Sequence, residues 1–123
     1  MADVETSLKQ ALTIPGAIGA ALVDYDSGMT LGASGGGPDL DLDVAAAGNT
    51  DVVRAKMRTM EQLGINDQIE DILITLGGAF HLIRLVRSAS GTGLFFYLAL
   101  DKGQANLAMA RRQLQNIEEQ LEI

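Results

Sequence analysis

Cysteine and tryptophan are absent from this sequence of 123 residues, and histidine occurs once, as His81. Without cysteine the chain has neither disulfide bonds nor thiolate metal ligands. A single histidine has no second imidazole or thiolate with which to share a metal, so we expect no metal site and no cofactor. Apolar runs are also short. The longest spans residues 94–100, far below the roughly 20 residues of a membrane-spanning helix.

Positive charge is scarce as well. Nine Lys and Arg against 16 Asp and Glu give a formal net charge of −7. This balance opposes non-specific binding to nucleic acid phosphates and to anionic membranes. The first six residues are polar and acidic, unlike a secretory signal peptide. With 47% apolar and 20% charged residues, the composition indicates one globular domain over residues 1–123, which we expect to be cytoplasmic and not inserted in a membrane.

Hydrophobic periodicity and turn residues predict eight elements in the order α-β-β-α-β-β-β-α. Helices are expected at residues 3–13, 39–63 and 102–121, and strands at 17–25, 29–34, 69–76, 79–87 and 94–100. The strand-to-strand links are short, so hairpin neighbours must be antiparallel. The strands at 17–25 and 94–100 are apolar on both faces, which is typical of central strands that are covered on both sides.

Turn and capping residues support these boundaries. Asp26-Ser27-Gly28 and residues 88–93 are turn signals, and Gly77-Gly78 predicts a type I′ hairpin turn in which both glycines have positive φ. Asp39, Asp41 and Asp43 precede the middle helix, where carboxylates cap free N–H groups, and Gly64 is a C-terminal cap. Asp101 is expected to cap the last helix.

Catalytic patterns are weak throughout. His81 is flanked by apolar strand residues and is best interpreted as a strand histidine at the sheet surface. No serine lies in a G-x-S-x-G elbow. The glycine-rich segment at 32–38 lacks the Lys-Ser/Thr ending of a phosphate-binding loop and is followed by aspartates. The alternating aspartates lack the Gly and Glu of a calcium loop. We therefore expect that the chain has no catalytic site and that the protein is not an enzyme.

Two charged residues fall on apolar strand faces. Arg84 shares a face with Phe80, Leu82 and Val86, and Asp71 lies among Ile69 and Leu73 on the preceding strand. A charge on such a face must be paired or lie near an interface. An Arg84–Asp71 pair across the sheet is one possibility, although the sequence does not fix the register of the two strands.

The middle helix carries more apolar surface than one sheet needs. Val53, Met57 and Met60 form a stripe, and further apolar residues lie off it. Such a helix favours two partners, its own sheet and a second copy of the helix. The helix residues expected at a dimer or partner interface are Ala46, Val52, Val53, Met57 and Met60.

Two stretches resemble the roadblock/dynein light chain domain family. Residues 16–28, GAIGAALVDYDSG, look like its opening hairpin. Residues 93–101, GLFFYLALD, followed by Asn106 to Arg112, NLAMARR, are similar to its last strand and helix. The resemblance covers nearly the whole chain, including the order of its elements.

The resemblance implies an α/β domain of the α+β type, a profilin-like roadblock sandwich with a five-stranded antiparallel sheet and helices on both faces. It implies a homodimer in which the middle helices pack together and the third strands pair. This pairing would add Ile69, Asp71 and Leu73 of the strand expected at 69–76 to the dimer or partner interface. The resemblance also implies a non-catalytic adaptor or regulator of a small Ras-like GTPase, in bacteria often one encoded nearby. The alternative that we retain is a small-molecule sensor with a pocket between sheet and helix.

Overall fold

The computed structural model describes residues 1–87 and 92–123. It confirms all eight elements and their order, as well as the predicted fold class. The elements are α1 (Val4–Leu12), β1 (Ala17–Asp24), β2 (Met29–Gly35), α2 (Leu42–Gln62), β3 (Asp71–Thr75), β4 (Ala79–Leu85), β5 (Leu94–Asp101) and α3 (Leu107–Gln120). Of the turn expected at 88–93, residues 88–91 lie outside the described part.

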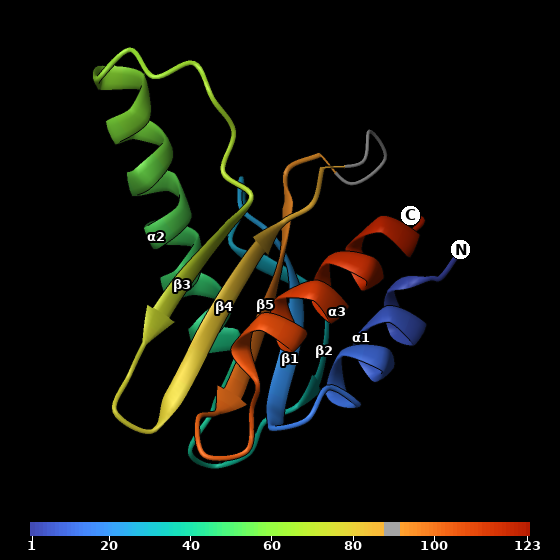
Figure 1. Ribbon diagram of the computed structural model, residues 1–123. Coiled ribbons are helices and arrows are strands. Elements are labelled where there is room, and N and C mark those ends of the chain that lie inside the picture. Colours follow the sequence, from blue (N-terminus) through green and yellow to red (C-terminus); the bar gives the residue numbers. More distant parts are fainter. Residues whose placement is uncertain (88–91) are drawn as a thin grey trace.

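The five strands form one antiparallel sheet in the order β2-β1-β5-β4-β3. The helices cover both of its faces, with α2 on one side and α1 and α3 on the other (Figure 1). β1 and β5 lie inside the sheet and are buried along most of their length. This confirms the interpretation of these two apolar runs as central strands, and it leaves β2 and β3 as the two edges.

Each sheet face has its own hydrophobic core. Beneath α1 and α3 the core contains Phe96, Leu98 and Leu114, all fully buried. Beneath α2 it contains Val53, Phe95 and Tyr97, which are also fully buried. Alternate residues of β5 therefore serve opposite cores, because successive side chains of a strand point to opposite faces. In the described part of the chain, no helix combines the length and the hydrophobicity needed to cross a membrane.

The ends of α2 follow the capping residues. The Asp41 carboxylate accepts hydrogen bonds from the N–H groups of Asp43 at 3.0 Å and Val44 at 3.2 Å. At the other end Gly64 has a φ of 69°, and the N–H of Ile65 donates to the carbonyl of Met60 at 2.9 Å. The helix thus begins with a side-chain cap and ends with a left-handed glycine.

Two predicted local features are wrong. The last helix begins at Leu107, where Asn106 is the cap, because Asp101 instead ends β5 and accepts the Gly103 N–H in a tight turn at 2.9 Å. The hairpin between β3 and β4 forms as expected, yet neither of its two glycines has a positive φ, so its turn is not of type I′.

The glycine run after β2 makes a tight backbone turn. Gly35 and Gly36 have φ values of 76° and 81°. A Cβ atom on Gly35 would lie 2.7 Å from the carbonyl oxygen of Ile18, and one on Gly36 would lie 2.8 Å from that of Leu40. Glycine is required here by backbone conformation and close approach, which gives the run a structural role.

The two chain ends lie side by side (Figure 1). Ala2 forms a parallel bridge with Leu121. The N–H of Ala2 donates to the carbonyl of Gln120 at 2.7 Å, and the N–H of Glu122 donates to the carbonyl of Ala2 at 2.8 Å. These bonds fasten the start of α1 to the end of α3.

We expect the substitution Asp41→Ala to lower the free energy of unfolding by about 1 kcal/mol, because two N–H groups of α2 lose their acceptor. Urea denaturation followed by circular dichroism measures the change. Asp39→Ala is the matched control, since Asp39 is an exposed carboxylate just before the helix. An equal loss in both variants would contradict the capping role of Asp41.

Candidate functional site

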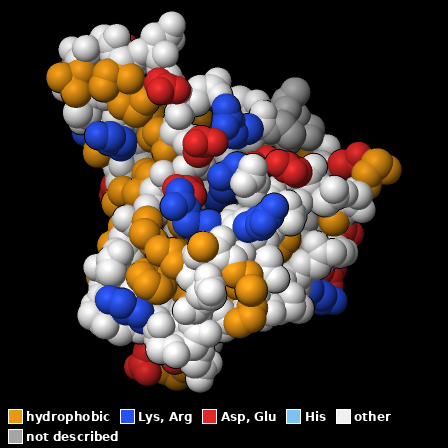
Figure 2. Space-filling model, viewed as in Figure 1, with side chains coloured by type: hydrophobic (Ala, Val, Ile, Leu, Met, Phe, Trp, Pro, Cys, Tyr) orange, Lys and Arg blue, Asp and Glu red, His pale blue; other side chains and the backbone are white. Residues whose placement is uncertain are grey.

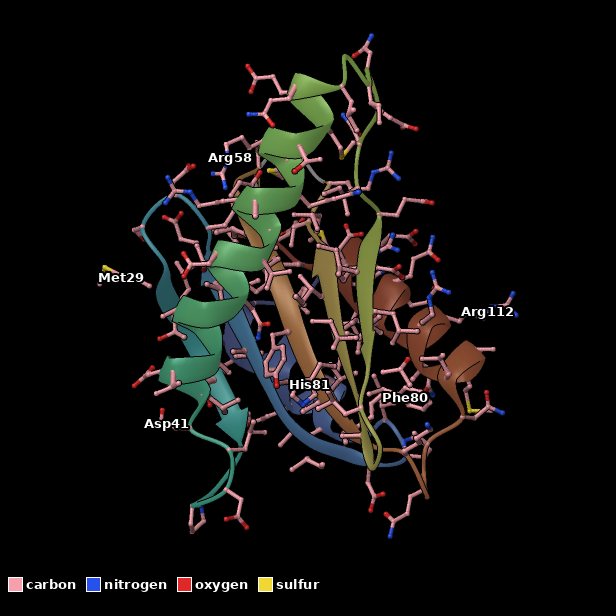
Figure 3. All side chains as sticks on the ribbon, turned by 90° about the vertical axis from the view of Figure 1, so that its left-hand side faces the viewer. Met29, Asp41, Arg58, Phe80, His81 and Arg112 are labelled. Atoms are coloured by element: carbon pink, nitrogen blue, oxygen red, sulfur yellow. The ribbon has the colours of Figure 1, made fainter. Side chains whose placement is uncertain are left out.

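The sheet face beneath α2 is only partly covered. α2 makes its main sheet contacts with β1 and β2, and in Figure 3 its ribbon crosses these strands while β4 and β3 lie beside it. A groove of about 520 Å³ lies between α2 and β3. Its lining residues are Val52, Lys56, Gln68, Ile69, Glu70, Asp71 and Ile72. We call this the α2–β3 groove.

Apolar side chains line the α2–β3 groove from both sides. Val52 of α2 is 37% exposed, and Ile72 of β3 is only partly buried against the core beneath α2. Ile74 lies two residues further along β3, on the same side and equally half-buried. Within the described residues β3 pairs only with β4, so its other edge has backbone groups without a strand partner there. An apolar surface beside an open strand edge is suited to binding another chain.

Two of the residues expected at an interface lie inside the subunit. Ala46 and Val53 are both fully buried. Together with Leu42 and Thr50 they form the buried stripe of α2. Their side chains therefore hold α2 on its own sheet and have no free surface in a single subunit.

Met57, Met60 and Ile69 meet at a second groove. This groove has a volume of about 430 Å³ and lies where the C-terminal part of α2 leaves the sheet. Tyr25 lines it as well, and burial is the main cause that raises the pKa of its hydroxyl. The three apolar residues that the sequence singled out here are thus brought together on an accessible surface.

Asp71 and Leu73 point to the other face of the sheet, towards α3. Leu73 packs against the core beneath α1 and α3, and the carboxylate of Asp71 binds the Arg111 guanidinium through two hydrogen bonds of 2.8 and 2.9 Å. Sequence reasoning missed Ile72 and Ile74, which occupy the α2 side of β3. Successive side chains of a strand point to opposite faces of the sheet, so the sides of Ile72 and Ile74 follow once the side of one β3 residue is known.

His81 lies on the α2 side of β4, opposite Ile74 of β3. Its Nδ1 is 3.3 Å from the hydroxyl of Tyr97, and the two rings meet edge to face with centroids 5.4 Å apart. Burial lowers the pKa of His81 and raises the pKa of Tyr97 to about 12. Both groups are therefore mainly neutral at pH 7, as expected for polar side chains on a largely apolar face.

The predicted pairing of Arg84 with Asp71 is wrong, although the two residues are direct cross-strand partners. The Arg84 Nε instead binds the carboxylate of Glu118 from α3 at 3.3 Å, and both side chains are almost completely buried. Helix α3 thus supplies a partner for each strand charge, Glu118 for Arg84 and Arg111 for Asp71. The sequence could not show this, because it does not reveal which helix covers the strands.

Among residues 1–87 and 92–123, no group of three or more His, Cys, Asp or Glu side chains is arranged to hold a metal ion. The apolar walls and open strand edge of the α2–β3 groove offer contacts to a second polypeptide.

Comparison with known proteins gives fold-level likenesses only. No protein-family model and no curated protein matches the sequence. Among solved structures, a roadblock/LC7 domain from Streptomyces avermitilis matches with a TM-score of 0.80 and 14% identity, over 96% of this chain and 93% of that one. MglB from Myxococcus xanthus matches with a TM-score of 0.73 and 16% identity, over 92% and 83%.

A third structure, the gliding protein MglB from Thermus thermophilus, matches with a TM-score of 0.70 and 18% identity, over 94% of this chain and 88% of that one. The chain therefore has the fold of roadblock/LC7 domains. This confirms the resemblance at the level of the fold.

We expect the protein to lose stability as the pH falls below about 6.5. Burial lowers the pKa of His81 below its ordinary value of 6.5, so the unfolded chain binds a proton there more readily than the folded one. The contribution is complete above pH 6.5 and is lost as the pH falls through the folded pKa. Thermal melts between pH 7.5 and 5.5 should show a smaller decline for His81→Phe. Equal declines in both proteins would contradict this account, and Tyr97→Phe serves as the control that keeps the imidazole.

Proposed function

We propose that this protein is a non-catalytic homodimeric adaptor or regulator that binds a small Ras-like GTPase. The observation that supports the proposal best is the α2–β3 groove, an apolar surface next to an open strand edge on a roadblock fold. The proposal also places the protein in the cytoplasm, where such GTPases act.

In the proposed dimer the β3 strands of two copies pair and their α2 helices lie side by side. The second α2 would cover the part of the sheet face that the first leaves open. Val52 and Ile72 would then lose their remaining exposure, as would the half-buried methionines Met57 and Met60. Ala46 and Val53 would contribute by fixing the position of α2.

The GTPase part of the proposal relies on the family resemblance and on the likeness to MglB. The roadblock family is associated with Ras-like GTPases. Any effect of this chain on GTP hydrolysis would come from positioning the GTPase's own residues, since the sequence offers no obvious arginine finger beyond generic surface arginines.

We expect the protein to behave as a dimer in solution, with twice the chain mass of 13.0 kDa. Val52→Asp should shift it to the monomer, because a second copy that covers the α2–β3 groove would have to strip the hydration from the new carboxylate. Light scattering coupled to size-exclusion chromatography measures the mass.

Met29→Asp is the matched control. Met29 is 69% exposed on the opposite sheet edge and points away from α2 in Figure 3, so this variant should remain dimeric. A wild-type protein that stays monomeric at high concentration would rule out the proposed dimer.

We expect binding to a Ras-like GTPase to depend on its bound nucleotide. The experiment compares GTPases loaded with GDP and with a non-hydrolysable GTP analogue in a pulldown on the immobilised protein, starting with any that is encoded nearby. Val52→Asp should weaken binding if the dimer forms the platform, while Met29→Asp should not. Failure of every candidate GTPase to bind in either state would count against the proposal.

The groove at Met57, Met60 and Ile69 keeps the small-molecule sensor as the second candidate. Its volume of about 430 Å³ lies within the range of ligand pockets. The two candidates differ in what reaches this surface, a small apolar molecule in one and a polypeptide in the other.

A further inference from the structure

A polar pocket lies on the face of the sheet opposite α2. It has a volume of about 330 Å³ and is bounded by β3, β4 and α3. Its polar lining consists of Glu70, Asp71, Arg84, Arg111, Arg112 and Gln115. Figure 2 shows Lys and Arg side chains gathered near the centre of this face, interleaved with Asp and Glu.

Arg84 is the innermost cation of the pocket. Only 6% of its surface is exposed. Its Nε donates to Glu118 at 3.3 Å. Within residues 1–87 and 92–123, its two terminal amino groups have no hydrogen-bond acceptor. A nearly buried guanidinium with this unengaged two-pronged donor edge is thus part of the pocket lining.

The other charges of the pocket differ in how fully they are engaged. Arg111 is held in two hydrogen bonds by Asp71, and Glu70 accepts a hydrogen bond from Arg87 Nη1 at 3.3 Å. Arg112 is exposed, and in Figure 3 its side chain extends from α3 into solvent. In the described part of the chain it has no ion pair. The donor edge of Arg84 and the whole of Arg112 thus remain available.

We propose that this pocket binds one carboxylate of an acidic segment of a partner protein. The carboxylate would accept two parallel hydrogen bonds from the terminal amino groups of Arg84, the arrangement that the planar fork of arginine favours. Arg112 would close over the bound group from solvent.

The balance of charge favours a carboxylate over a phosphate. Four guanidinium groups, those of Arg84, Arg87, Arg111 and Arg112, stand in and beside the pocket against three carboxylates, those of Glu118, Glu70 and Asp71, which leaves one positive charge. A monoanion neutralises it, whereas a phosphate dianion would add repulsion with Asp71 and Glu70. The net charge of −7 opposes the approach of acidic segments, so binding must rely on these short-range contacts.

The test is an NMR titration of the ¹⁵N-labelled protein that follows the arginine Nε–Hε signals. The probe is an N-acetylated, C-amidated peptide of four glutamates. We expect saturable shifts of the Arg84 signal. An amidated peptide of four glutamines should cause none, and inorganic phosphate should bind at least tenfold more weakly than the glutamate peptide. The four-glutamine peptide with a free C-terminal carboxylate distinguishes recognition of a chain end from recognition of an acidic side chain.

Three variants locate the site. Arg84→Lys keeps a cation for Glu118 but removes the forked edge, and should weaken binding of the glutamate peptide at least tenfold. Arg112→Gln should weaken it about two- to fivefold, as for an exposed charge. Arg58→Gln removes the same charge from exposed α2, on the other side of the sheet (Figure 3), and should leave the affinity unchanged.

Lack of a saturable Arg84 shift with either carboxylate peptide would overturn the proposal. Equal weakening by Arg58→Gln and Arg84→Lys would overturn it too, since general electrostatics would then explain the binding. The pocket does not require the proposed dimer, so the monomeric Val52→Asp variant should bind the glutamate peptide as the wild type does. Failure of the dimer and failure of the pocket are thereby separate results.

Discussion

Strands β1 and β5 are buried on both faces, so the fold depends on covering both sides of the sheet. Strands lie about 4.8 Å apart and a helix is about 10 Å across, which means that one helix covers roughly two strands. On one face α1 and α3 together cover the central strands and reach β4. On the other face α2 is alone above β1 and β2. The α2–β3 groove follows from this difference in width between one helix and five strands.

The charged contacts of α3 with β3 and β4 determine how this helix is fixed on the sheet. Arg84 and Glu118 are both nearly buried, and such a pair loses hydration that its attraction only partly offsets. The pair therefore contributes more to the orientation of α3 than to the net stability of the fold, because it holds α3 at one position against β4. The Asp71–Arg111 pair then joins the same helix to the edge strand.

Most of the fold could be predicted from the sequence because its signals are local. The apolar runs of β1 and β5, the cap at Asp41 and the glycine at Gly64 each describe their own surroundings. Two errors are local, the turn type at Gly77-Gly78 and the start of α3, and the others concern contacts between distant segments. Arg84 and Asp71 do lie opposite one another, yet α3 supplies the partner of each. The sequence predicted the α2 side of the candidate surface from the apolar residues of that helix. Ile72 and Ile74 were missed, because the sequence of a short strand does not show which of its two sides faces α2. The start of α3 was misplaced because an aspartate can accept backbone hydrogen bonds in a turn as well as at a helix N-terminus, and Asp101 does so in a turn.

The bridge between Ala2 and Leu121 has a consequence for how this domain can be joined to others. Both chain ends emerge at one corner, at the ends of α1 and α3, on the side of the sheet away from α2. Polypeptides fused before and after the domain would therefore begin close to one another in space. A short loop could also connect the original ends, with new ends opened at an exposed hairpin such as Gly77-Gly78. The apolar groove would remain unobstructed in either arrangement.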